Sequence, residues 1–475
     1  MTKNQPATPE LRRHLNVWDA ASVVIGIIVG SGIYKLAPGV ANNVSGPGML
    51  LLVWIIGGAI SLIGALCYAE LASRVKEPGG EYAYLKNSYG RPIAFLFAWA
   101  QFLIIRPGSI GAMAYVFAEY FQRFLPWSLG HYSLVILACS AVIALTTINA
   151  LGVTIGKWTQ NVLSLTKVIG LLAVIIVAFL LISPATSEPA VLENAQAATD
   201  SDSGRSLSLA FIFVLFAFGG WNDMTYIAAE IKQPRRNIVR ALILGTGTVV
   251  FIYLLLNAAF LYGLGFQGVR ESKLVASDLI ELRFPRIGGN AISLLVAVSC
   301  LGAIQGMIWT GSRLYFIFGK DFSLFHWLGH WNPRFKTPVR SLVGQALITM
   351  LLIIGFGPKP DGFEKMVIFT TPVFWFFLLL IGISIFWYRK QTRPRPDVYE
   401  IPLYPLTPIL FCMSCIVVLW LSINHVWDNS VIEAYWSLVV LAIGAVLAVF
   451  VALSSKPEPV AKNRAATGKS ADNKK

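Results

Sequence analysis

The stretch IGIIVGSGIY, residues 25–34, places three glycines and a serine in the middle of the first long apolar segment of this chain. Glycine has no side chain to restrict its backbone, so a helix that carries several glycines unwinds easily. Unwound backbone at the depth of a bilayer persists only where it is enclosed by protein or lines a cavity. The stretch therefore predicts a membrane helix that is broken half-way, with a binding site at the break.

A second glycine-rich stretch, FAFGGWN at residues 216–222, interrupts another apolar segment about half-way along the chain. Broken helices at corresponding places in two halves are typical of secondary transporters that are built from inverted repeats. An alternative for the first stretch is a close-packing face of small residues from Gly26 to Gly30. A dinucleotide-binding fingerprint is excluded by context, because no strand precedes these glycines.

The composition of the 475 residues, 56% hydrophobic and only 13% charged, indicates one membrane-embedded body. Ordinary soluble domains carry about 25% charged residues, and a spanning helix needs about 20 apolar residues. On that measure we expect twelve spans. They lie near residues 17–43, 48–73, 91–122, 132–152, 155–184, 207–230, 239–264, 289–319, 339–357, 365–388, 405–425 and 432–453.

The spans predict an all-α membrane protein with a single transporter domain. Spans 1–5 and 6–10 form two halves of opposite topology, because an odd number of spans inverts the second half. The expected units are an N-terminal segment 1–14, a domain 15–455 with repeats near 17–184 and 207–388, accessory helices 405–453 and a disordered tail 456–475.

A formal net charge of +14 raises the question of nucleic acid as a partner. With the N-terminus placed inside, however, most lysines and arginines fall in the inner loops and in the tail, which is the positive-inside rule. The basicity is therefore a topology signal. We expect both termini in the cytoplasm, a lipid bilayer as the surroundings and no nucleic-acid partner.

The first break offers binding groups for a zwitterion. Unwinding around Gly30, Ser31, Gly32 and Ile33 frees backbone N–H groups at the positive end of the following half-helix, which suits a carboxylate. A carbonyl that ends the preceding half-helix, near Ile28, suits an ammonium group.

The second break adds carbonyls at Phe216, Ala217 and Gly219 that could complete the ammonium site, and Phe216 could act as an aromatic gate. Asp223 follows near mid-span, where an acidic residue is costly and suggests function. The alternative for Asp223 is a half-solvated position in an inner vestibule.

Two basic residues also lie within spans. Lys167 in span 5 could bond carbonyls of the unwound span 1, and the alternative is a lysine that reaches along its helix to the surface. Arg106 precedes Pro107, which removes a helix hydrogen bond. We expect Arg106 to pair with the freed carbonyls or with a carboxylate such as Glu70 or Glu119, in a structural role.

The sequence predicts neither a metal site nor an enzyme. His326 and His330 have metal-ligand spacing, but they lack a convincing third ligand, and Gly329 weakens the helix between them. The five cysteines fall within apolar spans and form no zinc-type cluster, so we interpret them as buried free thiols. With five scattered histidines and no nucleophile–base pairing, no cofactor or catalytic residue is expected.

Several motifs resemble those of L-type amino acid transporters, a branch of the amino acid–polyamine–organocation superfamily. These are GSGI at 30–33, FAFGGWN at 216–222, LIIRPGS at 103–109, GSRLY at 311–315, KTPV at 336–339 and CYAEL at 67–71. The resemblance covers nearly all of residues 15–455, and the Ile-Ile-Arg-Pro stretch is the most specific to this branch.

The resemblance implies the leucine-transporter-type fold, a 5+5 inverted repeat with discontinuous helices 1 and 6. It also implies alternating access and sodium-independent exchange. By analogy, Ser31 and Gly32 would bind the substrate carboxylate, and carbonyls of Ile28, Phe216 and Gly219 would take its amino group. Lys167 matches the lysine that occupies the sodium position in the family. Asn222 matches a polar residue near the substrate.

Two departures from the family pattern bear on partners and substrate. The loop from Arg123 to His131 has no cysteine, whereas animal members use one there for a disulfide to a glycoprotein heavy chain. We therefore expect no such partner and a bacterial inner-membrane location. Gln305 in span 8, which contributes to the side-chain pocket, stands where animal members usually have Asn.

The sequence favours an exchanger of neutral L-amino acids. A transporter of cationic amino acids or polyamines, with or without proton coupling, is the alternative, and Asp223 and Glu230 motivate it. An amino acid sensor that binds without turnover is a second alternative, from another class of protein. The tail 456–475 is too short and too simple to suggest a signalling output.

Overall fold

The computed structural model describes residues 15–30, 32–75, 77–125, 130–184, 206–285, 287–357, 362–391, 398–428 and 432–454. Within these ranges the chain is helical and contains no β-strand. Three expectations fall outside them: Ser31, the N-terminal segment 1–14 and the tail 456–475.

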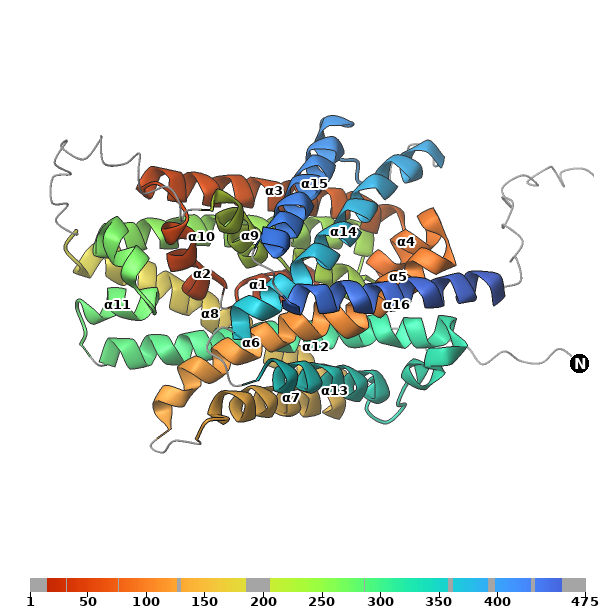
Figure 1. Ribbon diagram of the computed structural model, residues 1–475, viewed down its shortest axis with the longest axis horizontal. Coiled ribbons are helices and arrows are strands. Elements are labelled where there is room, and N and C mark those ends of the chain that lie inside the picture. The colour runs from red at the N-terminus through yellow and green to blue at the C-terminus, as the bar shows by residue number, and fades with distance from the viewer. Residues whose placement is uncertain are drawn as a thin grey trace, which may run out of the picture.

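The helices follow one another along the chain (Figure 1). Their bounds are α1 Val17–Ile28, α2 Gly32–Asn42, α3 Pro47–Arg74, α4 Glu81–Tyr89, α5 Arg91–Ala100, η1 Gln101–Ile105, α6 Arg106–Phe121, η2 Gln122–Phe124, α7 Ser133–Leu151, α8 Val153–Leu181, α9 Leu207–Ala217, η6 Trp221–Glu230, α10 Pro234–Glu271, α11 Val275–Glu281, α12 Ile287–Asp321, η7 Ser323–Gly329, α13 Val339–Phe356, α14 Gly362–Gln391, α15 Leu406–Asp428 and α16 Ile432–Ser454.

Ten helices or helix runs in the described part of the chain are long and apolar enough to cross a membrane, and the bent pair α1–α2 makes an eleventh candidate. The last expected span, 432–453, coincides with α16. Its apolar part, Tyr435–Val451, is shorter than the other spans and is not among these candidates. The coarse expectation of an all-helical, multi-span membrane protein is therefore confirmed.

The side chains of α8 illustrate how such a helix meets lipid. Leu165 and Ile169 are 62% and 58% exposed, whereas Ser164 and Lys167 on the other face are buried. A helix that turns apolar side chains outward and polar ones inward is suited to a bilayer and not to water.

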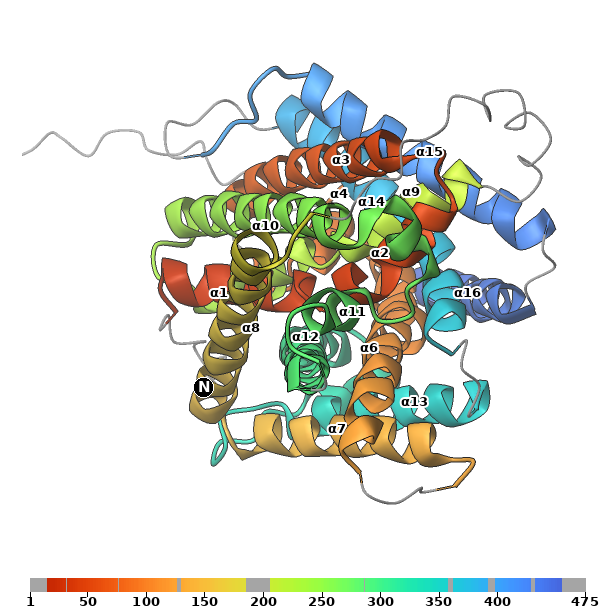
Figure 2. The ribbon, with the colours of Figure 1, turned by 90° about the vertical axis from the view of Figure 1, so that its left-hand side faces the viewer.

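The first predicted break coincides with the end of α1. This helix begins with a capping box between Asn16 and Asp19 and ends at Ile28. The next helix, α2, begins at Gly32 and is bent by 43° from it. α1 packs against α8, α10 and α12, and α2 packs against α9 and α10, so the break is inside the bundle (Figures 1 and 2).

The second predicted break coincides with the end of α9 at Ala217. Gly220 has a φ of 106°, a left-handed conformation that favours glycine, and η6 continues from Trp221. A Cβ on Gly220 would lie 2.5 Å from Cγ2 of Ile27, and a Cβ on Gly32 would lie 2.9 Å from Cα of Ala217. The two breaks therefore pack directly against each other.

Candidate functional site

A cavity lies where the two breaks meet α6, α12 and α14. Its empty volume, which includes space open to solvent, is about 820 Å³. Its apolar lining is Ile27, Ile28, Ile105, Met113, Leu215, Phe216, Met307, Phe374 and Trp375. Its polar lining is Gln101, Arg106, Ser109, Asn222, Asp223, Thr370 and Thr371, and Gly32, Ala217, Gly219 and Gly220 add backbone.

Most of the sequence-predicted substrate residues line this cavity. They are Ile28, Gly32, Phe216, Ala217, Gly219 and Asn222. Gly30 and Ile33 do not line it: a Cβ on Gly30 would lie 2.8 Å from Sδ of Met113, and Ile33 is completely buried. Ser31 lies outside the described residues.

The backbone at the first break already uses some of its groups. The carbonyl oxygen of Ile28 accepts hydrogen bonds from the Gly30 N–H at 2.8 Å and from the Tyr253 hydroxyl at 2.9 Å. A carbonyl oxygen has two lone pairs, so Ile28 is a poorer acceptor for an ammonium group than we expected. The N–H groups of the first turn of α2, in contrast, have no partner within their own helix.

Lys167 lies behind the break and not in the cavity. Its Nζ is 2.6 Å from the carbonyl oxygens of Gly26 and Val29, and the side chain is completely buried. A lysine that reaches along its helix to the surface would be exposed, so that alternative is wrong here. The ammonium group instead satisfies carbonyls at the end of α1, where the helix leaves acceptors unpaired.

Arg106 and Asp223 form an ion pair in the wall of the cavity. Both terminal nitrogens of Arg106 donate to the carboxylate of Asp223, with Nη2 3.0 Å from Oδ1. Their side chains are 4% and 7% exposed. Arg106 therefore pairs with a carboxylate, as expected, but not with either of the two named as examples, because Glu70 pairs with two other arginines and Glu119 pairs with Lys35 at 2.7 Å. The sequence does not reveal which carboxylate faces Arg106, because each of the three candidates lies on a span: Glu70, Glu119 and Asp223.

Glu81, the first residue of α4, was not singled out from the sequence. Its carboxylate accepts from the hydroxyls of Tyr68 and Tyr226 and from Nδ2 of Asn222 at 3.0 Å. Complete burial raises the pKa of Glu81 above its usual range, and these hydrogen bonds partly oppose that rise. The amide of Asn222, a predicted substrate residue, is therefore held by Glu81.

Gln305 does not reach the cavity. Its side-chain oxygen accepts from Nδ2 of Asn149 at 2.7 Å, and its nitrogen donates to the carbonyl of Gly156 at 3.2 Å. From α12 it is Met307 that lines the cavity. The expectation that Gln305 affects the side-chain pocket is thus not supported by a direct contact.

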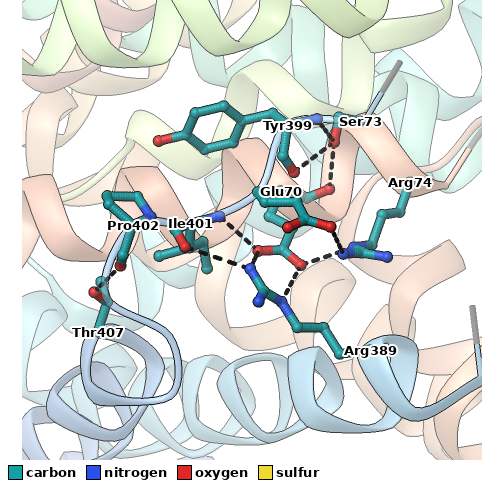
Figure 3. A network of polar contacts seen from close by, with 9 residues as sticks. Glu70, Ser73, Arg74, Arg389, Tyr399, Ile401, Pro402 and Thr407 are labelled. Carbon is teal, nitrogen blue, oxygen red and sulfur yellow. Dashed lines mark hydrogen bonds and ion pairs between the residues drawn. The ribbon is translucent and has the colours of Figure 1, made fainter. Parts of the chain in front are cut away.

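A second polar cluster, centred on Glu70 of α3, lies outside the cavity lining (Figure 3). Its carboxylate accepts from Nε of Arg74 at 2.7 Å, from Nη2 of Arg389 at 2.6 Å and from the Ile401 N–H at 2.9 Å. The Ser73 hydroxyl accepts from the Tyr399 N–H at 3.1 Å. This cluster ties α3 to α14 and to the segment that precedes α15.

Comparison with known proteins shows which family this chain matches. The family described as amino acid permease matches residues 15–448. The human b(0,+)-type amino acid transporter 1 is 29% identical over 82% of this chain and 80% of its own length. The serine/threonine exchanger SteT of Bacillus subtilis is 29% identical over 84% and 89%. The mouse large neutral amino acids transporter small subunit 2 is 29% identical over 89% and 78%.

Proposed function

The chain belongs to the amino acid permease family, and on that premise we propose that it exchanges neutral L-amino acids across a membrane without sodium. Its relatives are amino acid transporters and exchangers by name, which supports a membrane antiporter and not an enzyme. The observation that carries the proposal is the cavity enclosed by the two helix breaks.

We infer a leucine-transporter-type arrangement of twelve spans with a 5+5 inverted repeat. In it, α1–α2 and α9–η6 are the two discontinuous helices, α15 and α16 are accessory, and both termini lie inside a bacterial inner membrane. The positive-inside distribution of the sequence and the mutual packing of the breaks support this layout.

The backbone groups at the two breaks bind the two charged groups of the amino acid. The N-terminus of α2, at Gly32, takes the carboxylate through free N–H groups and the helix dipole. The amino group lies against carbonyls at Ala217 and Gly219, since that of Ile28 already accepts two bonds. Binding shifts the equilibrium between outward- and inward-open states only by its differential affinity for the two.

A neutral substrate is supported by the pairing of the acidic residues that motivated the cationic alternative. Asp223 is neutralised by Arg106, and Glu230 accepts from Nε of Arg313 at 3.0 Å. Neither carboxylate therefore offers an uncompensated negative charge to a cationic side chain. Lys167, for its part, supplies a fixed cation at the end of α1 that removes the need for sodium.

The test is uptake of labelled alanine into proteoliposomes that contain only the purified chain. We expect equal uptake in sodium and choline buffers, competition by neutral amino acids, and little competition by arginine or putrescine. Arginine as the stronger competitor would favour the cationic alternative. Ligand binding without any uptake would favour a sensor, or a need for a second subunit.

A further inference from the structure

One wall of the cavity comes from η1 and α6 and includes three polar side chains, those of Gln101, Arg106 and Ser109. Gln101, Ile105, Ser109 and Met113 line the cavity at intervals of four residues, and Arg106 lies beside Ile105. The turn before Arg106 is a π-helix, in which the Arg106 N–H bonds the carbonyl of Gln101. Pro107 follows and has no N–H to donate, so the wider turn avoids its clash with the preceding turn.

Two buried polar atoms of residues that line this wall have no hydrogen-bond partner among the described residues. They are Oε1 of Gln101 and Nε of Arg106, and both residues are at least 97% buried. A buried polar atom without a partner is costly, so such atoms usually meet a ligand or an ordered water. One of the two is an acceptor and the other is a donor.

Three other polar side chains of the cavity are already engaged in hydrogen bonds. The amide of Asn222 donates to Glu81 at 3.0 Å, and the hydroxyls of Thr370 and Thr371 donate to the carbonyl of Val367 at 3.0 and 2.6 Å. Asp223 holds both terminal nitrogens of Arg106. Besides the hydroxyl of Ser109, this wall therefore contains an unpartnered acceptor on Gln101 and an unpartnered donor on Arg106, and Asp223 balances the charge of Arg106.

We propose that Gln101 and Arg106 form the subsite for the substrate side chain, and that it selects uncharged side chains which both donate and accept a hydrogen bond. These are the hydroxyl of serine and threonine and the carboxamide of asparagine and glutamine. This inference rests on the proposed function, because it assumes that an amino acid occupies the cavity. An apolar side chain of equal size would leave both buried atoms unpaired, which disfavours it strongly.

The experiment compares substrates of equal shape that differ only in polarity. Threonine is compared with valine and glutamine with methionine, as inhibitors of alanine exchange and as ligands that raise the melting temperature of the purified protein. For the unaltered chain we expect threonine to bind at least about tenfold more tightly than valine. Equal affinity for the two would overturn the subsite.

The variant is Gln101→Met, which keeps about the length of the side chain and removes its carboxamide, oxygen and nitrogen together. We expect the preference for threonine over valine to fall by about tenfold, with affinity for alanine changed much less. The matched control is Thr349→Val in α13, which removes a buried hydroxyl that lies outside the cavity lining and is bonded within its own helix at 2.8 Å. It should leave the ratio of threonine to valine unchanged.

The outcomes separate this inference from the proposed function. Selective binding of threonine without exchange would retain the subsite and reject the exchanger. Exchange with no discrimination between threonine and valine would retain the exchanger and reject the subsite. If Gln101→Met weakens alanine and threonine equally, Gln101 has a structural role only. If it changes neither affinity, an ordered water and not the substrate side chain bonds Gln101, and the subsite is rejected.

Discussion

At the scale of single residues, Lys167 is the residue whose contacts were best predicted from the sequence. A lysine far from either end of an apolar span has to find acceptors inside the protein, and the nearest acceptors in such a fold are the unpaired carbonyls of a broken helix. Its contacts with Gly26 and Val29 have that character.

Replacing Lys167 with Met should slow alanine exchange at least about tenfold. The change removes two charge-assisted hydrogen bonds, of which each contributes about 1.5–3 kcal/mol, and about 1.4 kcal/mol already corresponds to a factor of ten. The measurement is the initial rate of exchange in proteoliposomes at matched protein content.

The control for this change is Lys157→Met on the same helix. Lys157 pairs with Asp19 at 2.9 Å, but its side chain is 22% exposed. Partly exposed ion pairs contribute little, so the rate should stay within about twofold of the unaltered protein. An unimpaired Lys167→Met variant would show that the contact with the break is dispensable.

Replacing Asp223 with Asn should admit acidic amino acids. The guanidinium of Arg106 would then face the cavity without its counter-charge, and glutamate should become a competitor of alanine exchange. Removing one partner of a buried pair also destabilises a protein by about 3–5 kcal/mol, so the melting temperature should fall.

Glu119→Gln is the matched charge removal outside the cavity. It breaks the pair with Lys35, whose side chain is 23% exposed, and should leave the competition profile unchanged. If glutamate competes no better against Asp223→Asn than against the unaltered chain, Arg106 does not contribute to the electrostatics of substrate binding.

Residues whose partners lie on distant helices were the hardest to place from sequence. Asp223 was recognised as costly, but its pairing with Arg106 depends on how α6 and η6 face each other. Glu81 lay in a segment interpreted as a loop, and no spacing connected it with Tyr226. Gln101 had a usable signal, since it is a polar residue four and eight positions before Ile105 and Ser109 on one helical face.

At the scale of elements, the two helix breaks were predictable because a local property, glycine content, causes them. Their mutual packing was not, since it depends on the fold. The π-helical turn at Gln101–Ile105 was also missed, although Pro107 indicated a disturbed helix. The cluster around Glu70, which joins α3 to α14 and the chain before α15 (Figure 3), links segments that are hundreds of residues apart in the sequence.

Replacing Gly32 with Ala should impair exchange, because the new Cβ would lie 2.9 Å from the backbone of Ala217 at the second break. Backbone cannot rotate away as a side chain can, so one break has to move relative to the other. We expect a loss of at least about tenfold in exchange rate, the scale of a small misplacement at a binding site.

The control is Gly48→Ala in α3, where a Cβ would meet no atom within 4 Å. Alanine also favours the helix, by about 1 kcal/mol relative to glycine. This variant should exchange alanine normally. Equal behaviour of the two variants would contradict a tight contact between the breaks.

At the scale of the whole molecule, composition and loop charge were enough to predict a multi-span membrane protein, and the family match supports an antiporter. Those signals average over many residues, so single errors matter little. The substrate class depends instead on a few side chains in one cavity, which is why the sequence left neutral and cationic amino acids open. The pairing of Asp223 and Glu230 now favours the neutral class.

The most direct measurement is efflux of labelled alanine from proteoliposomes in sodium-free buffer, with and without unlabelled amino acid outside. An obligatory exchanger reorients slowly when empty. We therefore predict efflux only when an external neutral amino acid is present, and the same rate after sodium is added. Rapid efflux into buffer without amino acid, or efflux that requires sodium, would contradict a sodium-independent exchanger.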